Sequence, residues 1–322
     1  MIDFTKRDFS DGTQEHSGDI KERGLFDKYV SRQLPDALRF LGDNYKELDV
    51  FIDPNLKALR CYMRPEGPPS FTSTMLRELV VLHRAIQGLF ASLPPGAEPP
   101  FGYYVQGSRL PGIYNLGGDL GFLIDRIAAS DREALRRYAY DCVQAVYNAA
   151  VGFDLPIVSV CLLEGTAMGG GLECAVCCNY VIAERGVRMG MPEIMFNAFP
   201  GMGAYTFLSR RIGGALTERL IFSGRVYTAD EMYEMGVVDK VVEDGRGEAA
   251  VRDYILGERQ SHTVRHAMYK VRQRVNPVTL AELRDVTDIW VETMLKLDPG
   301  DLRRMEHLQL AQVRRQSRAR TG

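Results

Sequence analysis

Three consecutive glycines, Gly169, Gly170 and Gly171, separate a β-branched apolar run from a segment that is compatible with a helix. The run IVSVCLLEG over 157–165 is typical of a strand buried on both faces. Glycine after such a strand lets a ligand approach the backbone N–H groups at a helix start, where the helix dipole favours developing negative charge. The sequence therefore predicts a strand, a tight glycine turn and a helix around a ligand site.

Two glutamates follow the glycines. Glu173 comes two residues after Gly171, and Glu193 lies 20 residues further on, after Pro192. Carboxylates beside such a turn suggest acid–base chemistry on an oxyanion. A solvated helix position for Glu173 is the simpler alternative, but its apolar neighbours indicate partial burial. For Glu193, a charge that only stabilises a helix start is an equally good explanation from the residues alone.

Strands and helices alternate along most of the chain, which predicts an α/β fold. We expect a hairpin over 47–63, then a helix from about residue 74 capped by Ser73 or Thr74. A second glycine loop lies at 110–120, where Asp119 is placed to cap the next helix. We predict three regions: an N-terminal arm or helical extension (1–45), a core domain (46–245) and a C-terminal helical region (246–322).

Composition excludes several classes of function. The formal net charge of −2 gives no field for nucleic acid, and no apolar run is long enough to span a membrane, so we expect a cytoplasmic protein without membrane insertion. Six cysteines are too few for a disulfide framework. The C-x-x-C spacing within 174–178 has no second ligand pair, so we expect buried thiols and no metal.

A basic segment, RHAMYKVRQR, occupies residues 265–274. An acidic carrier protein or the phosphates of coenzyme A could use such a patch. A solvated helix face explains it equally well.

Five motifs in a fixed order resemble the crotonase (enoyl-CoA hydratase/isomerase) superfamily. They are ALRCYMRP, YNLGGDL, EGTAMGGGLECAV, MGMPEIMFNAFPGMGA and SGRVYTADEMYEMGVVDKVV, within 58–243. The resemblance implies a β-spiral core of two roughly perpendicular sheets surrounded by helices, with C-terminal helices that mediate trimerisation.

Within that superfamily the chain is most similar to the bacterial diffusible signal factor (DSF) synthases. This resemblance rests on YNLGGDL, on the paired glutamates, and on the C-terminal segments VRQRVNPVTLAELRDVTDIWVETML and DLRRMEHL. It implies an enzyme that dehydrates a 3-hydroxyacyl thioester on acyl carrier protein and then hydrolyses the thioester, releasing a cis-2-unsaturated fatty acid for quorum sensing. No cofactor is implied beyond the phosphopantetheine of the carrier protein or coenzyme A. The implied partners are that carrier, a sensor histidine kinase and further copies of the chain, as trimer or hexamer.

The resemblance also assigns site residues. It implies an oxyanion hole from the backbone N–H groups of Leu116 and Gly170, with Gly117 in the substrate-binding loop. Glu173 and Glu193 become the catalytic pair, one taking the α-proton while the other protonates the departing 3-hydroxyl; which is acid and which is base stays open. Two other functions remain: an ordinary enoyl-CoA hydratase, and a thioester-binding or receptor-interacting protein without turnover.

Overall fold

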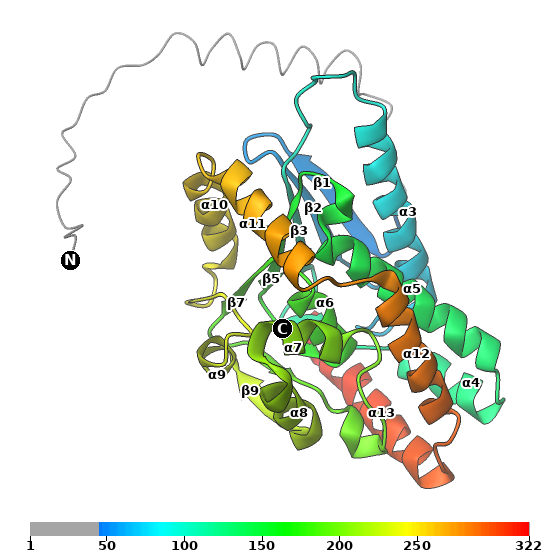
Figure 1. Cartoon of the computed structure of the whole chain (residues 1–322). Coiled ribbons are helices and arrows are strands. Elements are labelled where there is room, and N and C mark those ends of the chain that lie inside the picture. The colour runs from blue at the N-terminus through cyan, green and yellow to red at the C-terminus, as the bar shows by residue number, and fades with distance from the viewer. Residues whose placement is uncertain (1–44, 322) are drawn as a thin grey trace. The chain divides into compact units, whose positions relative to one another are not determined.

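Two β-sheets form the centre of residues 45–321, the part of the chain that the computed structural model describes (Figure 1). The larger sheet has six strands in the order β1-β2-β3-β5-β7-β10, and the smaller has four in the order β4-β6-β8-β9. Helices surround both sheets, so the predicted α/β class is confirmed. The predicted arm over 1–45 lies outside the described residues, except for residue 45.

The chain passes repeatedly from the large sheet into the small one. Each passage joins a long strand to a short one: β3 (Tyr103–Ser108) to β4 (Ile113–Asn115), β5 (Val158–Leu163) to β6 (Thr166–Met168), and β7 (Tyr180–Glu184) to β8 (Arg188–Gly190). Strands β4, β6 and β8 are parallel neighbours. Because the carboxyl ends of parallel strands lie at the same edge of a sheet, the segments after these three strands come together there.

The outer strands complete both sheets. The expected hairpin is present, since β1 (Leu48–Asp53) pairs antiparallel with β2 (Ala58–Met63). At the opposite edge, β10 (Lys240–Val242) runs parallel to β7. In the small sheet, β9 (Val226–Thr228) pairs antiparallel with β8.

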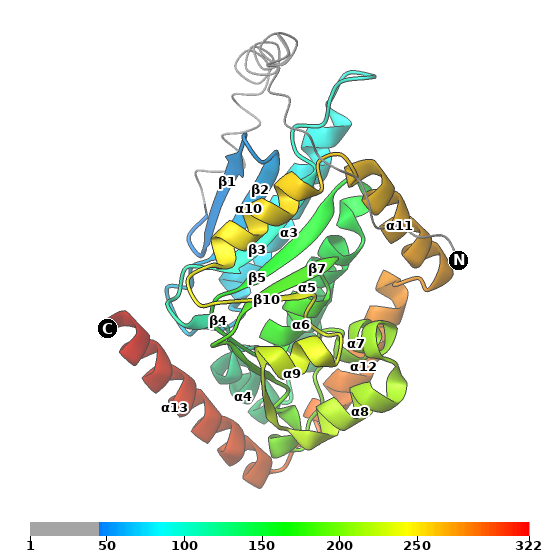
Figure 2. The ribbon, with the colours of Figure 1, turned by 90° about the vertical axis from the view of Figure 1, so that its left-hand side faces the viewer.

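Helices cover both faces of the large sheet. On one face, Val251 and Ile255 of α10 (Gly247–Gly257) pack with strand residues that include Val105; Figure 2 shows α10 lying across the strands. On the other face, His83 of α3 (Ser73–Ala91) contacts the ring of Tyr104 edge-on. The N-cap of α3 is Thr72, whose side chain accepts from the N–H of Met75, so the predicted caps at Ser73 or Thr74 were wrong by one or two residues.

Further helices connect the strands and close the small sheet. They are α4 (Leu120–Ala128), α5 (Arg132–Ala150), α6 (Gly170–Val176), α7 (Ala204–Ile212), α8 (Gly214–Ser223) and α9 (Ala229–Glu234), with 3₁₀ turns η1 (Gly152–Asp154) and η2 (Glu193–Phe196). Asp119 and Asp131 cap α4 and α5 through hydrogen bonds to Phe122 and Ala134. Asp119 therefore caps the helix that it was expected to cap.

The C-terminal region is helical, as expected: α11 (His262–Val275), α12 (Leu280–Met294) and α13 (Pro299–Thr321) follow α10. Helix α12 packs against α5, and α13 packs against α4 (Figure 2). Among the described residues, this region belongs to the same compact unit as the core. Trimerisation stays a prediction. None of the helices in the described part combines the length and apolar character needed to cross a membrane.

Candidate active site

The segments that follow β4, β6 and β8 bring the predicted site residues together. Residues 116–119 follow β4, Gly169 leads from β6 into α6, and Glu193 begins η2 shortly after β8. The first two segments touch, because a Cβ atom built on Gly117 would lie 3.2 Å from the backbone nitrogen of Gly170. The edge of the small sheet is therefore the place where both glycine loops and both glutamates can act on one ligand.

Close approach explains the glycines at this edge. A Cβ on Gly171 would lie 2.1 Å from the backbone oxygen of Asn115, and one on Gly169 would lie 2.2 Å from Oε1 of Glu193. Gly169 also has φ +50° and ψ −124°, and Gly117 has φ +99°. Residues with a side chain rarely adopt such backbone angles. Glycine is thus needed here both for conformation and for space.

Hydrogen bonds of the loop 116–119 show which of its N–H groups is free to bind a ligand. Leu116 donates to the carbonyl of Pro69 (2.8 Å), and Gly117 donates to Oδ1 of Asn115 (2.8 Å). Asp119 donates to the hydroxyl of Tyr138 (2.9 Å). Within the described part of the chain, no acceptor is recorded for the N–H of Gly118.

The expected donor, Leu116, is therefore corrected to Gly118. Leu116 is buried, and a buried N–H needs a protein acceptor, which the carbonyl of Pro69 provides. Gly118 is half-buried and lies beside the contact between Gly117 and Gly170. The N–H of Gly170, in the first turn of α6, likewise has no recorded acceptor among the described residues, as expected for a helix start. Gly118 and Gly170 thus offer two N–H donors where the two glycine loops meet.

Three other segments hold this loop in place. The N–H of Phe71 donates to the carbonyl of Gly117 (2.8 Å), and the amide of Gln312 on α13 donates to the carbonyl of Leu116 (2.9 Å). The hydroxyl of Tyr138 donates to the carbonyl of Phe71 (2.6 Å) while it accepts from Asp119. Donors fixed in this way before a ligand arrives stabilise a developing oxyanion most effectively.

Tyr138→Phe is expected to destabilise the protein by about 1–3 kcal/mol, because the carbonyl of Phe71 and the N–H of Asp119 would both lose their partner. Urea denaturation measures this free energy. Tyr147→Phe on the same helix is the matched control, since no side-chain hydrogen bond is recorded for that hydroxyl in the described structure. An equal loss in both variants would contradict the role assigned to Tyr138.

Glu173 is a buried carboxylate whose position is fixed by two backbone donors. Its Oε1 accepts from the N–H groups of Met202 (2.7 Å) and Ala204 (2.8 Å). Burial, and after it the negative charge of Glu193, raise the pKa of Glu173 to about 8, although the two N–H bonds act in the opposite direction. Glu173 can therefore hold a proton near neutral pH, which an ordinary glutamate cannot.

Glu193 is half-buried as a residue, but its Oε2 atom is buried and has no hydrogen-bond partner within the described residues. Burial raises the pKa of Glu193 to about 7. An unpaired buried carboxylate oxygen is costly and is usually explained by a ligand or a water molecule. Both glutamates thus have the perturbed pKa values that are common at functional sites.

The cysteines near the glycine turn, and those elsewhere in the described chain, have no disulfide partners. All six are free and buried, as expected. No cluster of three metal-ligating side chains occurs among residues 45–321. Sequence reasoning missed Gly118, Tyr138 and Gln312. Gly118 stood in the quoted motif YNLGGDL, but only the hydrogen bonds distinguish its N–H from those of its neighbours.

Known proteins share both the sequence pattern and the fold. The model of the family "Enoyl-CoA hydratase/isomerase" matches residues 104–292. Human mitochondrial methylglutaconyl-CoA hydratase is 34% identical over 146 residues, which cover 45% of this chain and 41% of the relative. Crotonyl-CoA hydratase of Syntrophomonas wolfei is 31% identical over 129 residues, covering 39% of this chain and 46% of the relative. The match thus spans less than half the length of these curated relatives.

A solved structure agrees at the level of the fold. Pseudomonas aeruginosa DspI superposes with a TM-score of 0.59 and 23% sequence identity, covering 73% of this chain and 91% of that chain. At this identity the likeness shows the fold alone. The family match, by contrast, covers more than half of the chain and includes both glycine loops and both glutamates, so the chain belongs to the enoyl-CoA hydratase/isomerase family.

Proposed function

We propose that this protein eliminates water from a 3-hydroxyacyl thioester and then hydrolyses the thioester, releasing a cis-2-unsaturated fatty acid of the DSF type. The observation that carries the proposal is one site with two carboxylates of raised pKa next to the free N–H groups of Gly118 and Gly170. Water elimination needs a proton acceptor, a proton donor and a stabilised enolate. This set of groups can supply all three.

In the elimination step, an ionised glutamate takes the proton from C2 of the substrate. The electron pair of that C–H bond moves toward the thioester carbonyl, whose oxygen becomes an oxyanion held by the two N–H donors. The carbonyl then re-forms as the C2–C3 double bond is made. The 3-hydroxyl leaves as water with the proton of the other, protonated glutamate. A proton must then pass back between the glutamates before the next turnover.

In the release step, the same groups would act on water. A glutamate removes a proton from a water molecule that attacks the carbonyl carbon, and the N–H donors hold the tetrahedral oxyanion. Collapse of this intermediate breaks the C–S bond, and the thiol of the phosphopantetheine leaves with a proton. Support for this step comes from the sequence resemblance to DSF synthases.

An enoyl-CoA hydratase is the second candidate, because the curated relatives described above are hydratases of CoA thioesters. The two candidates share the glutamates and the N–H donors but differ in the fate of the thioester. Incubating the full chain with 3-hydroxydodecanoyl carrier protein and identifying products by mass spectrometry separates them. Free cis-2-dodecenoic acid supports the proposal; enoyl thioester without free acid supports the hydratase, as does rapid hydration of trans-2-enoyl-CoA. Neither product from either substrate would contradict both.

We expect the elimination rate to pass through a maximum between about pH 7 and pH 8. The pKa of Glu193 is raised to about 7 and that of Glu173 to about 8. Below this window both carboxyls are protonated and no base is present; above it both are ionised and no acid remains. The two groups titrate as a coupled pair, so the profile reports the pair and not either residue. The pH dependence of kcat, measured under saturating substrate, checks this expectation, and a rate that rises steadily to pH 10 would contradict it.

A further inference from the structure

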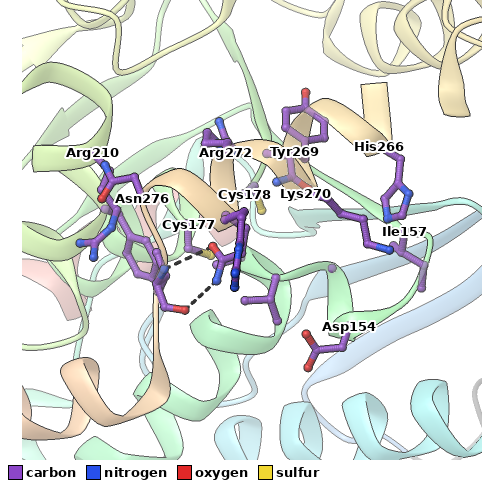
Figure 3. Close-up of a pocket in the computed structure, with 18 of the residues that line it drawn as sticks. Asp154, Ile157, Cys177, Cys178, Arg210, His266, Tyr269, Lys270, Arg272 and Asn276 are labelled. Carbon is purple, nitrogen blue, oxygen red and sulfur yellow. Dashed lines mark hydrogen bonds between the residues drawn. The ribbon is translucent and has the colours of Figure 1, made fainter. Parts of the chain in front are cut away.

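A pocket of about 410 Å³ is lined in part by basic residues of α11, namely Lys270, Arg272 and Arg274 (Figure 3). Its wall is formed by the segment after α5, the C-terminal end of α6, helix α7, α11 and the turn that follows α11. Neither Glu173 nor Glu193 lines it. Helix α6 thus contributes its first turn to the candidate active site and its other end, with Cys177 and Cys178, to this pocket.

Positive charge dominates the wall of the pocket. Five Arg and Lys side chains line it together with His266, against the single carboxylate of Asp154: Arg210 and Arg211 of α7, and Lys270, Arg272 and Arg274 of α11. The two arginines of α7 have acidic partners, Glu282 and Asp239. For the three cations of α11, no ion pair is recorded within the described residues. Arg265 is half-buried and pairs with Glu258, whereas Lys270, Arg272 and Arg274 line the pocket with side chains that are exposed to solvent.

The positive side chains that line the pocket repel one another. Partial desolvation at the pocket wall, and then the positive charge of Arg211, lower the pKa of Arg272, although its side chain remains exposed and Asp239 acts in the opposite direction. Like charges that line one pocket are stabilised when an anion binds between them. Arginine suits this task because its planar guanidinium donates two parallel hydrogen bonds to an oxyanion.

The size and the apolar part of the pocket restrict the ligand further. A volume of about 410 Å³ falls within the usual range for organic ligands and exceeds what one free phosphate needs. Phe207, Tyr269 and Val278 provide apolar surface beside the cations. Figure 3 labels Arg210 of α7 and Lys270 and Arg272 of α11 among the residues that line the pocket.

We propose that this pocket is a binding site for an organic anion that carries at least one phosphate, held by Lys270 and Arg272 and distinct from the catalytic glutamates. The net positive wall favours a ligand with more than one negative charge, and the apolar residues contact its organic part. The proposal does not depend on the reaction proposed above.

Calorimetric titration of the full chain with inorganic pyrophosphate, at 150 mM NaCl, tests the charged half of the site. We expect saturable binding that weakens about tenfold or more in Lys270→Gln/Arg272→Gln, because hydrogen bonds to two charged donors are lost. The matched control is Arg137→Gln/Arg252→Gln, which removes the same charge from exposed positions outside the pocket. Equal weakening in both double variants, or no binding by the unmodified chain, would overturn the proposal.

Two further binding experiments test whether this site is separate from the catalytic one and which kind of phosphorylated ligand occupies it. Glu173→Gln is expected to bind pyrophosphate as tightly as the unmodified chain, whatever its effect on turnover; loss of binding would contradict a distinct site. Competition by coenzyme A, but not by pantetheine, would support a site for the phosphates of the substrate carrier. Pyrophosphate binding that coenzyme A does not displace would support a site for a separate phosphorylated metabolite.

Discussion

Glu173→Gln is expected to lower kcat of the elimination by roughly 10²–10⁴-fold, the usual contribution of a general acid or base. The amide keeps the shape of the side chain and can still accept the N–H bonds of Met202 and Ala204. It cannot exchange a proton with the substrate. Turnover of 3-hydroxyacyl thioester by mass spectrometry measures the effect, with circular dichroism as the test of folding.

The matched control is Glu164→Gln. The pKa of Glu164 is also raised, to about 7, mainly by partial desolvation and then by Glu248 and Glu184. It is an exposed residue at the turn between β5 and β6, and the two carboxylates that raise its pKa, Glu248 of α10 and Glu184 of β7, lie outside the candidate active site. We expect Glu164→Gln to change kcat less than about threefold. A comparable loss in both variants would indicate a general electrostatic effect and would refute the catalytic assignment of Glu173.

Glu173→Gln should also change how the free energy of unfolding depends on pH. The pKa of Glu173 in the folded protein, about 8, lies above the ordinary value of 4.5. Protonation of Glu173 therefore contributes to the free energy of unfolding. The contribution is fully present below pH 4.5 and is lost as the pH rises through 8. Above pH 8 the variant with a neutral amide should be at least as stable as the unmodified chain in urea. A less stable variant at pH 9 would show that the amide disturbs the packing.

Local sequence signals predicted the elements and the two glutamates. The hairpin, the strand before the glycines and the helix after Asp119 each depend on residues adjacent in sequence, so periodicity and turn residues suffice. The spiral order of the strands came from the resemblance to a known superfamily. Nothing in the local pattern specifies which strands become neighbours.

The choice of oxyanion donor could not be made from the sequence, because it depends on distant partners. Leu116 is excluded by the carbonyl of Pro69, and Asp119 by the hydroxyl of Tyr138 on α5. The surroundings of the basic segment 265–274 could not be predicted from the sequence either. Lys270 is exposed, and the pocket that it lines is formed with α7 and with the segment after α5, which lie far from it in sequence. Contacts between remote segments therefore determine the chemistry of both sites.

Gly169→Ala is expected to lower kcat about 10²-fold, because its new Cβ atom would lie only 2.2 Å from Oε1 of Glu193. Glu193 would have to move by an ångström or more, and a displacement of this size can cost about that factor in rate. Steady-state kinetics on the purified variant gives kcat, and urea denaturation gives its stability.

Backbone strain has to be separated from the displacement of Glu193, since Gly169 has a positive φ that alanine resists. Gly245→Ala is the matched control: its φ is +77°, and a Cβ there meets no atom within 4 Å. Both variants should lose about 1 kcal/mol or more of stability from strain, but only Gly169→Ala should lose activity. Backbone strain is present in both variants, so it cannot explain a loss of kcat that occurs in Gly169→Ala alone. Such a loss would indicate that the Glu193 carboxylate lies against Gly169 during turnover. Full activity in Gly169→Ala would mean that Glu193 does not act from that position.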